Sequence, residues 1–480
     1  MTQRAKPRIL WFRTDLRLHD NPALDAACEG GPPVIPIYIL DHDLEDRPIG
    51  SAAAWWLDKS LKALVEALEA KGSNLILRRG DCREIIPELA AHTGAEAVLW
   101  NRLHQAASDR RDDALKMVLE KAGVRVETFN ASLLVEPDSL RTGSGGAYKV
   151  FTPFSHAIRQ RLAHAPKPTA APRSMPAPEH WPKSEALKGW GLHPHSPDWS
   201  KGFDWTPGEA SALNTLETFT EQHLADYPTL RDRPDCDLTS RLSPHLRWGE
   251  ASPWRVIAAA RFAADSGDAG DTAAETFVGE VLWREFNQHI LAAFPDLPHK
   301  PIRPEFARFP WRKAPKDVDA WTRGLTGYPI VDAGMRQLWA AGWMHNRVRM
   351  VAASFLVKHL RIDWREGERW FWDTLVDADP GNNPGNWQWS AGSGADAAPY
   401  FRIFSPEAQG TRFDPDGTYV RRWIPELARV PAKHIHAPWK APGLVLEEAG
   451  VRLGRNYPHP LVEHAQARQA ALDAFASLKN

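Results

Sequence analysis

The hydrophobic pattern of the chain changes near Gly208, and this change limits the folds that the chain can adopt. In residues 1–130 short apolar runs alternate with helical patterns, whereas beyond Gly208 strand-like runs nearly vanish and helical stretches follow one another. The first pattern is typical of a parallel sheet with helices on both faces, and the second of a helical domain. We therefore predict an N-terminal, Rossmann-like α/β domain followed by an all-α domain.

Five apolar runs are the predicted strands of the α/β domain. They lie at residues 9–12, 34–40, 75–77, 97–100 and 124–126. Between them, residues 52–70 place apolar side chains at the three-and-four spacing of one buried helix face, and residues 110–122 repeat this more weakly. No G-x-G-x-x-G motif follows the first run, so the sequence does not support a dinucleotide site at the first strand.

The connector and the helical half set the predicted domain boundaries. Residues 166–207 are rich in Pro, His, Ser and Lys and lack periodicity, which favours a long connector on the surface. Helices are predicted at residues 273–293, 330–341, 348–360 and 366–375. The predicted organisation is an α/β domain over residues 1–130, a connector over 131–208 and a helical domain over 209–480.

Composition excludes several kinds of protein. The 480 residues carry 59 basic and 60 acidic side chains, so a nucleic-acid surface has to be a local basic patch. The sequence has no uninterrupted apolar run of membrane-spanning length and no signal-like N-terminus, so we expect a cytoplasmic protein without membrane contact. Its three cysteines lack C-x-x-C spacing, which leaves no disulfide framework.

Residues Asp377–Trp389 bring together carboxylates, amides and two indoles. Their Gly and Pro residues predict a loop without regular helix, while Asp and Asn offer hydrogen bonds. Trp387 and Trp389 offer flat apolar faces that stack on a ring or a base. Two interpretations stay open at this point: a binding loop, and a surface loop anchored by two core tryptophans.

Polar and aromatic side chains share a helix face in two further places. The first set consists of Glu280, Trp283, Arg284 and Asn287, and it suits either a pocket wall or an exposed face with an ion pair. The second set consists of Asn346, Arg349 and Met350, with Arg347 on another face. This second segment either binds phosphate or lies in solvent.

Two smaller patterns concern anions and metals. Residues 238–243 combine three hydroxyls, an arginine and a predicted helix start, which favours a diphosphate cradle or an ordinary helix cap. His345, His434 and His436 have no carboxylate or cysteine at recognisable ligand spacing, so no metal site is predicted.

In their order along the chain these segments resemble the DNA photolyases of the photolyase/cryptochrome superfamily, of class I or class III type. The matching motifs are Gly143–Pro153, Tyr227–Ser243, Glu280–Phe286, Thr326–Ala333, Gly342–Arg347, Asp363–Glu368 and Phe401–Pro406. The resemblance covers nearly the whole chain. It implies a helical domain that holds FAD, and repair of cyclobutane pyrimidine dimers in UV-damaged DNA by a monomer. Light excites the reduced flavin, an electron passes to the flipped-out dimer, the ring splits, and the electron returns.

The resemblance also assigns cofactor residues. They are Tyr227, Thr239, Ser240, Arg241, Leu242, Ser243, Phe277, Arg284, Asn346, Arg349, Asp377, Asp379 and Asn383. Asp377 is expected to pair with Arg349, and Asn383 to face flavin N5. An uncharged amide at this position is compatible with an anionic reduced flavin and favours repair over the plant-type cryptochromes, which have Asp there.

Lesion and relay residues follow from the same resemblance. The expected DNA contacts are Arg231, Glu280, Trp283, Asn287, Asn346, Arg347, Met350, Trp389 and Gln409. Glu280 would hydrogen-bond a thymine carbonyl, while Trp283 and Trp389 would stack on the dimer. Catalytic roles are expected for Glu280 and Asn383, and for an electron relay of Trp387, Trp364 and Trp311.

The sequence leaves two interpretations open for the antenna pigment and two for the biological role. Folate-type relatives bind methenyltetrahydrofolate near segments that correspond to residues 40–51 and 101–112, but a carboxylate of that family aligns here with Ser108. We therefore expect methenyltetrahydrofolate, with a deazaflavin as the alternative. The rival function is that of a cryptochrome, a blue-light sensor without repair activity. Asn383, Trp283, Trp389 and Met350 argue against it.

Overall fold

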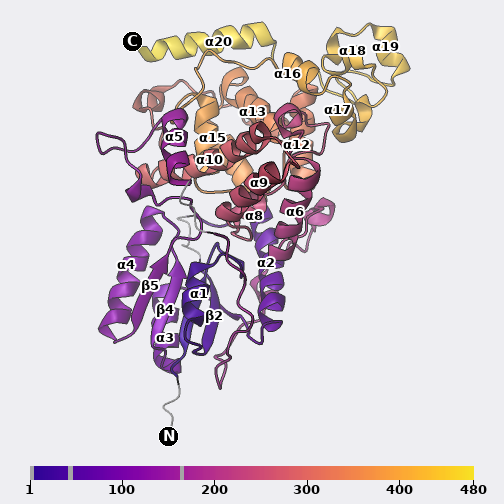
Figure 1. The fold of residues 1–480 in the computed structure, drawn as a ribbon. Helices are drawn as coiled ribbons and strands as arrows, with labels where there is room; N and C mark the ends of the chain where they lie inside the picture. The colour runs from indigo at the N-terminus through magenta and orange to yellow at the C-terminus, as the bar shows by residue number, and fades with distance from the viewer. Residues whose placement is uncertain (1–4, 42–46, 163–166, 480) are drawn as a thin grey trace. The chain divides into compact units, whose positions relative to one another are not determined.

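The computed structural model describes residues 5–41, 47–162 and 167–479 (Figure 1). Its backbone forms two compact units. The first comprises Met1–Pro197, Trp205–Ala225 and Ser240–Pro295, and the second comprises Asp198–Asp204, Asp226–Thr239 and Asp296–Asn480. Residues 42–46 of the predicted antenna segment and residues 163–166 within the predicted connector lie outside the described residues.

A parallel sheet forms the centre of the first unit. Its strands, within the described residues, are β1 (Arg8–Phe12), β2 (Val34–Leu40), β3 (Ile76–Arg79), β4 (Ala97–Asn101) and β5 (Arg125–Phe129). They lie in the order β3-β2-β1-β4-β5, and every pair is parallel. The predicted α/β architecture is confirmed, because each predicted apolar run overlaps one strand.

Helices cover both faces of this sheet. Ile9 and Trp11 pack in one core with apolar residues of α3 (Cys82–Thr93) and α4 (Ala106–Lys121). Side chains alternate along a strand, so Leu10 and Phe12 face the other side, where α1 (Pro22–Cys28) contacts β1, β4 and β5 (Figure 1). The central strands β1, β2 and β4 are largely buried on both faces, which explains why their runs are mostly apolar.

Further helices belong to the first unit. They are α2 (Ser51–Glu69), α5 (Phe151–Leu162), α6 (Glu209–Gln222), α8 (Ser243–Arg247), α9 (Pro253–Ser266) and α10 (Asp271–Ala293). The segment after α8 packs tightly against the chain that follows β1, because a Cβ at Gly249 would lie 2.1 Å from the Thr14 carbonyl oxygen. Glu250 is buried beside it and accepts a hydrogen bond from Trp56 Nε1 (3.0 Å). The boundaries of the two compact units differ from the predicted domain boundaries.

Part of the predicted connector is hydrogen-bonded to the sheet of the first unit. The backbone N–H of Val34 donates to the Pro176 carbonyl, and that of Met175 donates to the Lys71 carbonyl. At β3, Leu77 donates to Ser184 Oγ (2.9 Å) and accepts from the Glu185 N–H (2.8 Å). This stretch covers the outer edge of β3 and satisfies part of its backbone.

The second unit is helical. Its helices, within the described residues, are α7 (Tyr227–Leu230), α11 (Pro315–Thr322), α12 (Pro329–Ala341), α13 (Asn346–Ser354), α14 (Trp364–Thr374), α15 (Asn382–Ala391), α16 (Pro406–Phe413), α17 (Thr418–Trp423), α18 (Ala432–Ile435), α19 (Gly443–Glu448) and α20 (His464–Ala476). α12, α13 and α14 correspond to predicted helices. α13 continues into a π-helical turn, Phe355–His359. No helix among the described residues combines the length and the apolarity needed to cross a membrane.

Lys358 is buried in the π-helical turn. Its Nζ donates to the Arg402 carbonyl (2.9 Å) and lies 5.2 Å from the centre of the Tyr400 ring. Burial, with a smaller contribution from Arg402, lowers the pKa of Lys358 to about 7 from its ordinary 10.5. The folded protein thus disfavours the charged form that an unfolded chain keeps up to about pH 10.

Replacement of Lys358 by Met tests this burial through the pH dependence of stability. Between about pH 7 and pH 10 the unfolded chain binds more protons at Lys358, so the wild-type free energy of unfolding gains up to about 1.4 kcal/mol per pH unit. Lys358→Met should lack this gain and be the more stable protein near pH 7. Urea unfolding of both proteins across this range measures it, and parallel curves would contradict it.

Candidate flavin and DNA site

The segment Asp377–Trp389 is largely helical, so the predicted loop was wrong from residue 382 onward. α15 begins at Asn382, and Asp379 Oδ1 accepts hydrogen bonds from the backbone N–H groups of Gly381 (2.9 Å) and Asn382 (2.7 Å). Pro384 lies in the first turn, where a backbone N–H has no partner within the helix. Proline therefore starts this helix and does not break it.

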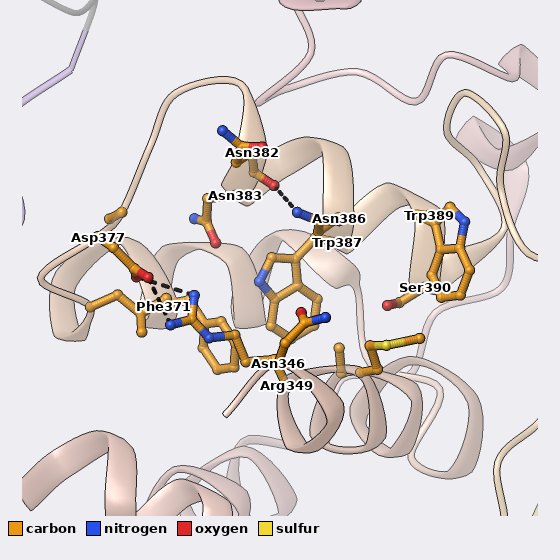
Figure 2. A pocket seen from close by; sticks show the side chains of 14 residues that line it. Asn346, Arg349, Phe371, Asp377, Asn382, Asn383, Asn386, Trp387, Trp389 and Ser390 are labelled. Carbon is orange, nitrogen blue, oxygen red and sulfur yellow. Dashed lines mark hydrogen bonds and ion pairs between the residues drawn. The ribbon is translucent and has the colours of Figure 1, made fainter. Parts of the chain in front are cut away.

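α13, α14 and α15 surround a pocket of the second unit (Figure 2). Its cavity volume is about 90 Å³, and the space between its walls opens to solvent. Its lining residues are Asn346, Arg349, Met350, Ala353, Phe371, Leu375, Asp377, Ala378, Asn382, Asn383, Asn386, Trp387, Trp389 and Ser390. Seven of them are site residues predicted from the sequence, and they come from two separate segments.

An ion pair closes one side of the pocket. Arg349 Nη1 and Nη2 donate to Asp377 Oδ1 (3.1 Å) and Oδ2 (2.9 Å), as the dashed lines in Figure 2 mark. Arg349 Nε donates to the Met344 carbonyl (2.7 Å), which fixes the plane of the guanidinium. The Asp377 side chain is only 4% exposed. The predicted pairing is therefore present, in the bidentate geometry that holds both groups firmly.

Asn383 has an orientation that the sequence did not predict. Its Nδ2 donates to the backbone carbonyl of Glu368 (3.0 Å) and to Glu368 Oε1 (2.8 Å). Both amide hydrogens are thereby used. Among the described residues none donates to Asn383 Oδ1, so the side chain offers the pocket a hydrogen-bond acceptor.

Trp387 supplies the apolar wall of the pocket. A Cβ at Gly367 of α14 would come within 2.1 Å of the Trp387 ring, so only glycine permits this contact. Phe371 lies edge-on to the same indole, with ring centres 5.0 Å apart. Phe371 of α14 and Leu375, directly after its end, were missed by the sequence analysis, although their apolar spacing belongs to the pattern that predicted the helix.

The three predicted relay tryptophans lie in or against one core of the second unit. Trp364 and Trp387 are buried, and Trp311 is partly buried against the same core. The indole of Trp387 lies edge-on to the indole of Trp321, with 6.0 Å between ring centres. Trp321 is fully buried, donates to the Ala352 carbonyl and had no predicted role.

Three predicted DNA-contacting residues of the second unit, Arg231, Arg347 and Gln409, do not line the pocket. Arg347 Nη2 donates to Asp232 Oδ2 (2.6 Å), and its guanidinium lies 4.6 Å from the centre of the Phe413 ring. Arg231 lies over the Tyr227 ring at 5.4 Å. Gln409 lies on α16. Arg347 is on a different face of α13 from the pocket residues, as predicted.

In the first unit, α10 carries Phe277, Glu280, Trp283, Arg284 and Asn287. Glu280, Trp283 and Arg284 are half-buried, and Asn287 is buried. Arg284 donates to the carbonyls of Ser132 (3.0 Å) and Leu246 (3.4 Å). It therefore joins three segments of the unit, and its predicted cofactor contact stays a prediction.

The predicted diphosphate cradle lies at the junction of two chain segments that belong to different units. Thr239 ends a segment of the second unit, while Ser240, Arg241, Leu242 and Ser243 open a segment of the first. α8 begins at Ser243, as predicted. Arg241 has a positive φ of 51°, and its guanidinium lies over the Trp205 ring at 4.2 Å. Asp379 makes its bonds at the start of α15, so its cofactor role also stays a prediction.

The carboxyl edge of the sheet carries a second cluster of buried charge. Arg13 donates to both oxygens of Asp112 (2.8 and 3.1 Å). The Arg111 side chain is 9% exposed, and its Nε and Nη1 are buried without a hydrogen-bond partner among the described residues. Ser108 is buried on the same helix. Ligands of parallel α/β sheets bind at this edge.

The two folds and the pocket residues together define a class, the flavoproteins of the photolyase and cryptochrome type. Residues 8–175 match the family model for DNA photolyase, and residues 277–477 match that for the FAD binding domain of DNA photolyase. The chain belongs to the DNA photolyase family.

Individual relatives agree with this assignment. A deoxyribodipyrimidine photo-lyase of Agrobacterium fabrum is 51% identical, with 100% of this chain and 99% of the relative covered. A crystal structure of a bacterial class III photolyase from Agrobacterium tumefaciens matches with a TM-score of 0.97 at 50% identity, with 100% and 99% coverage. Cryptochrome-1 of Arabidopsis thaliana is 36% identical over 98% of this chain and 70% of the relative.

Proposed function

We propose that this protein repairs cyclobutane pyrimidine dimers in UV-damaged DNA with light energy, with FAD in the pocket of the second unit. The observation that carries the proposal is the fixed amide of Asn383. Because Glu368 takes both amide hydrogens, Asn383 presents an acceptor oxygen, which fits the N–H of a reduced flavin. Bound reduced FAD would supply the light-excited electron.

The pocket residues have separate tasks in this proposal. Arg349 and Asp377 hold the polar edge of the cofactor through their bidentate ion pair. Phe371 and Trp387 exclude water from its apolar face, and Asn346 and Met350 on α13 line the side from which a base approaches. Trp389 is the proposed stacking surface for the dimer. None of these residues has to take up a substrate proton.

The remaining assignments rest on sequence resemblance and stay proposals. The cofactor set outside the pocket is Tyr227, Thr239, Ser240, Arg241, Leu242, Ser243, Phe277, Arg284 and Asp379. The DNA set outside the pocket is Arg231, Glu280, Trp283, Asn287, Arg347 and Gln409. Residues 209–480 are proposed as the catalytic domain, and the protein is proposed to act as a monomer in the cytoplasm.

Light-dependent loss of dimers tests the function directly. Purified holoprotein is mixed with a duplex that contains one thymine dimer, illuminated with blue light and compared with a dark sample. Repair in the illuminated sample alone is expected. Flavin binding without dimer loss, on duplex and on single-stranded DNA, would favour the cryptochrome alternative over the photolyase.

Loss of the Glu368 carboxylate tests the orientation of Asn383. Glu368→Leu removes the side-chain acceptor and keeps the backbone one, so the amide is held by one hydrogen bond in place of two. We expect a several-fold lower yield of dimer splitting per absorbed photon, since a misdirected hydrogen bond costs roughly 1–3 kcal/mol. Glu368→Gln keeps an acceptor for Asn383 and is the matched control. Equal yields in the wild type and Glu368→Leu would remove the proposed role of the fixed amide.

For the antenna we propose methenyltetrahydrofolate at the first unit. The Arg111 guanidinium atoms without partners among the described residues support an anionic ligand near the carboxyl edge of the sheet. A near-ultraviolet absorption band of the purified protein beyond that of FAD would indicate folate. A band in the blue region of the flavin itself would indicate a deazaflavin instead.

A further inference from the structure

Trp283 of α10 is stacked on another aromatic ring. The rings of Phe151 and Trp283 are nearly parallel, with an interplanar angle of 5° and 3.7 Å between their centres. Phe151 is the first residue of α5, directly after the Gly-rich stretch Gly143–Val150. Two segments far apart in the sequence thus place one ring on the face of the other.

The stacked pair is held by a third ring. Phe286 lies edge-on to Phe151 (5.9 Å, 78°) and to Trp283 (5.8 Å, 82°) and is buried. Phe154 of α5 also contacts Phe286, with ring centres 5.1 Å apart. Nearly eclipsed parallel rings are not the arrangement that free aromatic pairs prefer, so the packing around Phe286 imposes it.

Helix α5 is itself tied to α10 beside this pair. Arg159 of α5 forms an ion pair with Glu275 of α10, and Lys149 lies 5.2 Å from the centre of the Phe294 ring. Residues before and after Phe151 in the sequence therefore make contacts with α10 or the residue that follows it, and these contacts position Phe151. It stays half-buried, as does Trp283.

We propose that Phe151 is a positioning residue for lesion recognition, acting through Trp283. An indole has two faces, and Phe151 covers one of them, so a pyrimidine can stack only on the opposite face. Phe151 also fixes the tilt of the indole before DNA arrives, which lowers the entropic cost of binding. The inference depends on the proposed function, in which Trp283 stacks on the dimer.

The test is binding of DNA in the dark by the holoprotein. We expect Phe151→Leu to raise the Kd for a dimer-containing duplex by about fivefold to tenfold, since stacking of a base on an aromatic side chain is worth about 5-fold to 150-fold in affinity. The Kd for undamaged duplex and the FAD content should stay unchanged. Phe151→Tyr keeps the ring and should bind like the wild type. Phe262→Leu, at a Phe of α9 that is 70% exposed, is the matched control.

A double mutant separates this positioning role from a general structural one. In the Trp283→Ala background, Phe151→Leu should add no further loss of dimer affinity. An equal loss in both backgrounds, or no loss in the wild-type background, overturns the inference alone. If Trp283→Ala binds the dimer like the wild type, the lesion role of Trp283 fails and the inference with it. Phe151→Met serves in the same comparison if the Leu variant does not fold.

Discussion

Trp387→Phe is expected to slow photoreduction of oxidised FAD on the order of 100-fold, equivalent to about 2.7 kcal/mol in the barrier. A phenyl ring is far harder to oxidise than an indole, so it cannot pass an electron from Trp364 towards the flavin. Repair by enzyme reduced chemically beforehand should stay close to that of the wild type. Flavin absorbance under blue light, with an external reductant present, measures the first effect.

Trp321→Phe is the control for the route of this electron. Trp321 is the indole in contact with Trp387, with 6.0 Å between ring centres, and it was not part of the predicted relay. If electrons travel through Trp364 and Trp311, Trp321→Phe photoreduces normally while Trp364→Phe does not. The reverse result would reassign the relay to Trp321, and normal photoreduction in Trp387→Phe would exclude both routes.

Arg349→Leu is expected to cost about 3–5 kcal/mol of stability and most of the bound FAD, because it leaves the buried Asp377 carboxylate without its partner. The structural and the cofactor-binding parts of this effect are separable. Urea unfolding of the FAD-free protein reports the first, and the ratio of FAD to protein after purification reports the second.

The double variant Arg349→Leu/Asp377→Leu separates the loss of stability from the loss of FAD binding. Replacing a buried ion pair by apolar side chains of similar size is often neutral for stability, so we expect most of the lost stability to return. FAD affinity should not return, since the charged edge of the pocket is absent. A double variant that retains FAD like the wild type would show that the pair serves only the fold.

The fold was largely predictable because its signals are local. Each strand of the sheet overlaps a predicted apolar run, and α12 and α14 follow the helical spacing that predicted them. The loop prediction for Asp377–Trp389 was wrong from residue 382 onward, because Gly and Pro were treated as helix breakers regardless of position. Pro384 lies in the first turn and Asp379 caps it, so the same composition starts a helix.

The sequence predicted which residues form the site, but it did not predict how their side chains are oriented. Resemblance of motifs named Arg349, Asp377 and Asn383, and the structure brings these three into one pocket. Phe371 was missed, because an apolar residue on a helix gives no sign of whether its side chain enters a core or a pocket. The cofactor role of Arg284 stays a prediction. Its bonds to the carbonyls of Ser132 and Leu246 depend on segments more than thirty residues away along the chain, which no local pattern indicates.

The sequence by itself determined the order of strands and helices, the family and the residue types of the site, since these depend on short-range periodicity and on motif order. Only the tertiary structure decided how particular groups are presented. The direction of the Asn383 amide depends on Glu368, and one face of the Trp283 indole is covered by Phe151. Such orientations arise from contacts between segments that are distant in sequence, which no local pattern encodes.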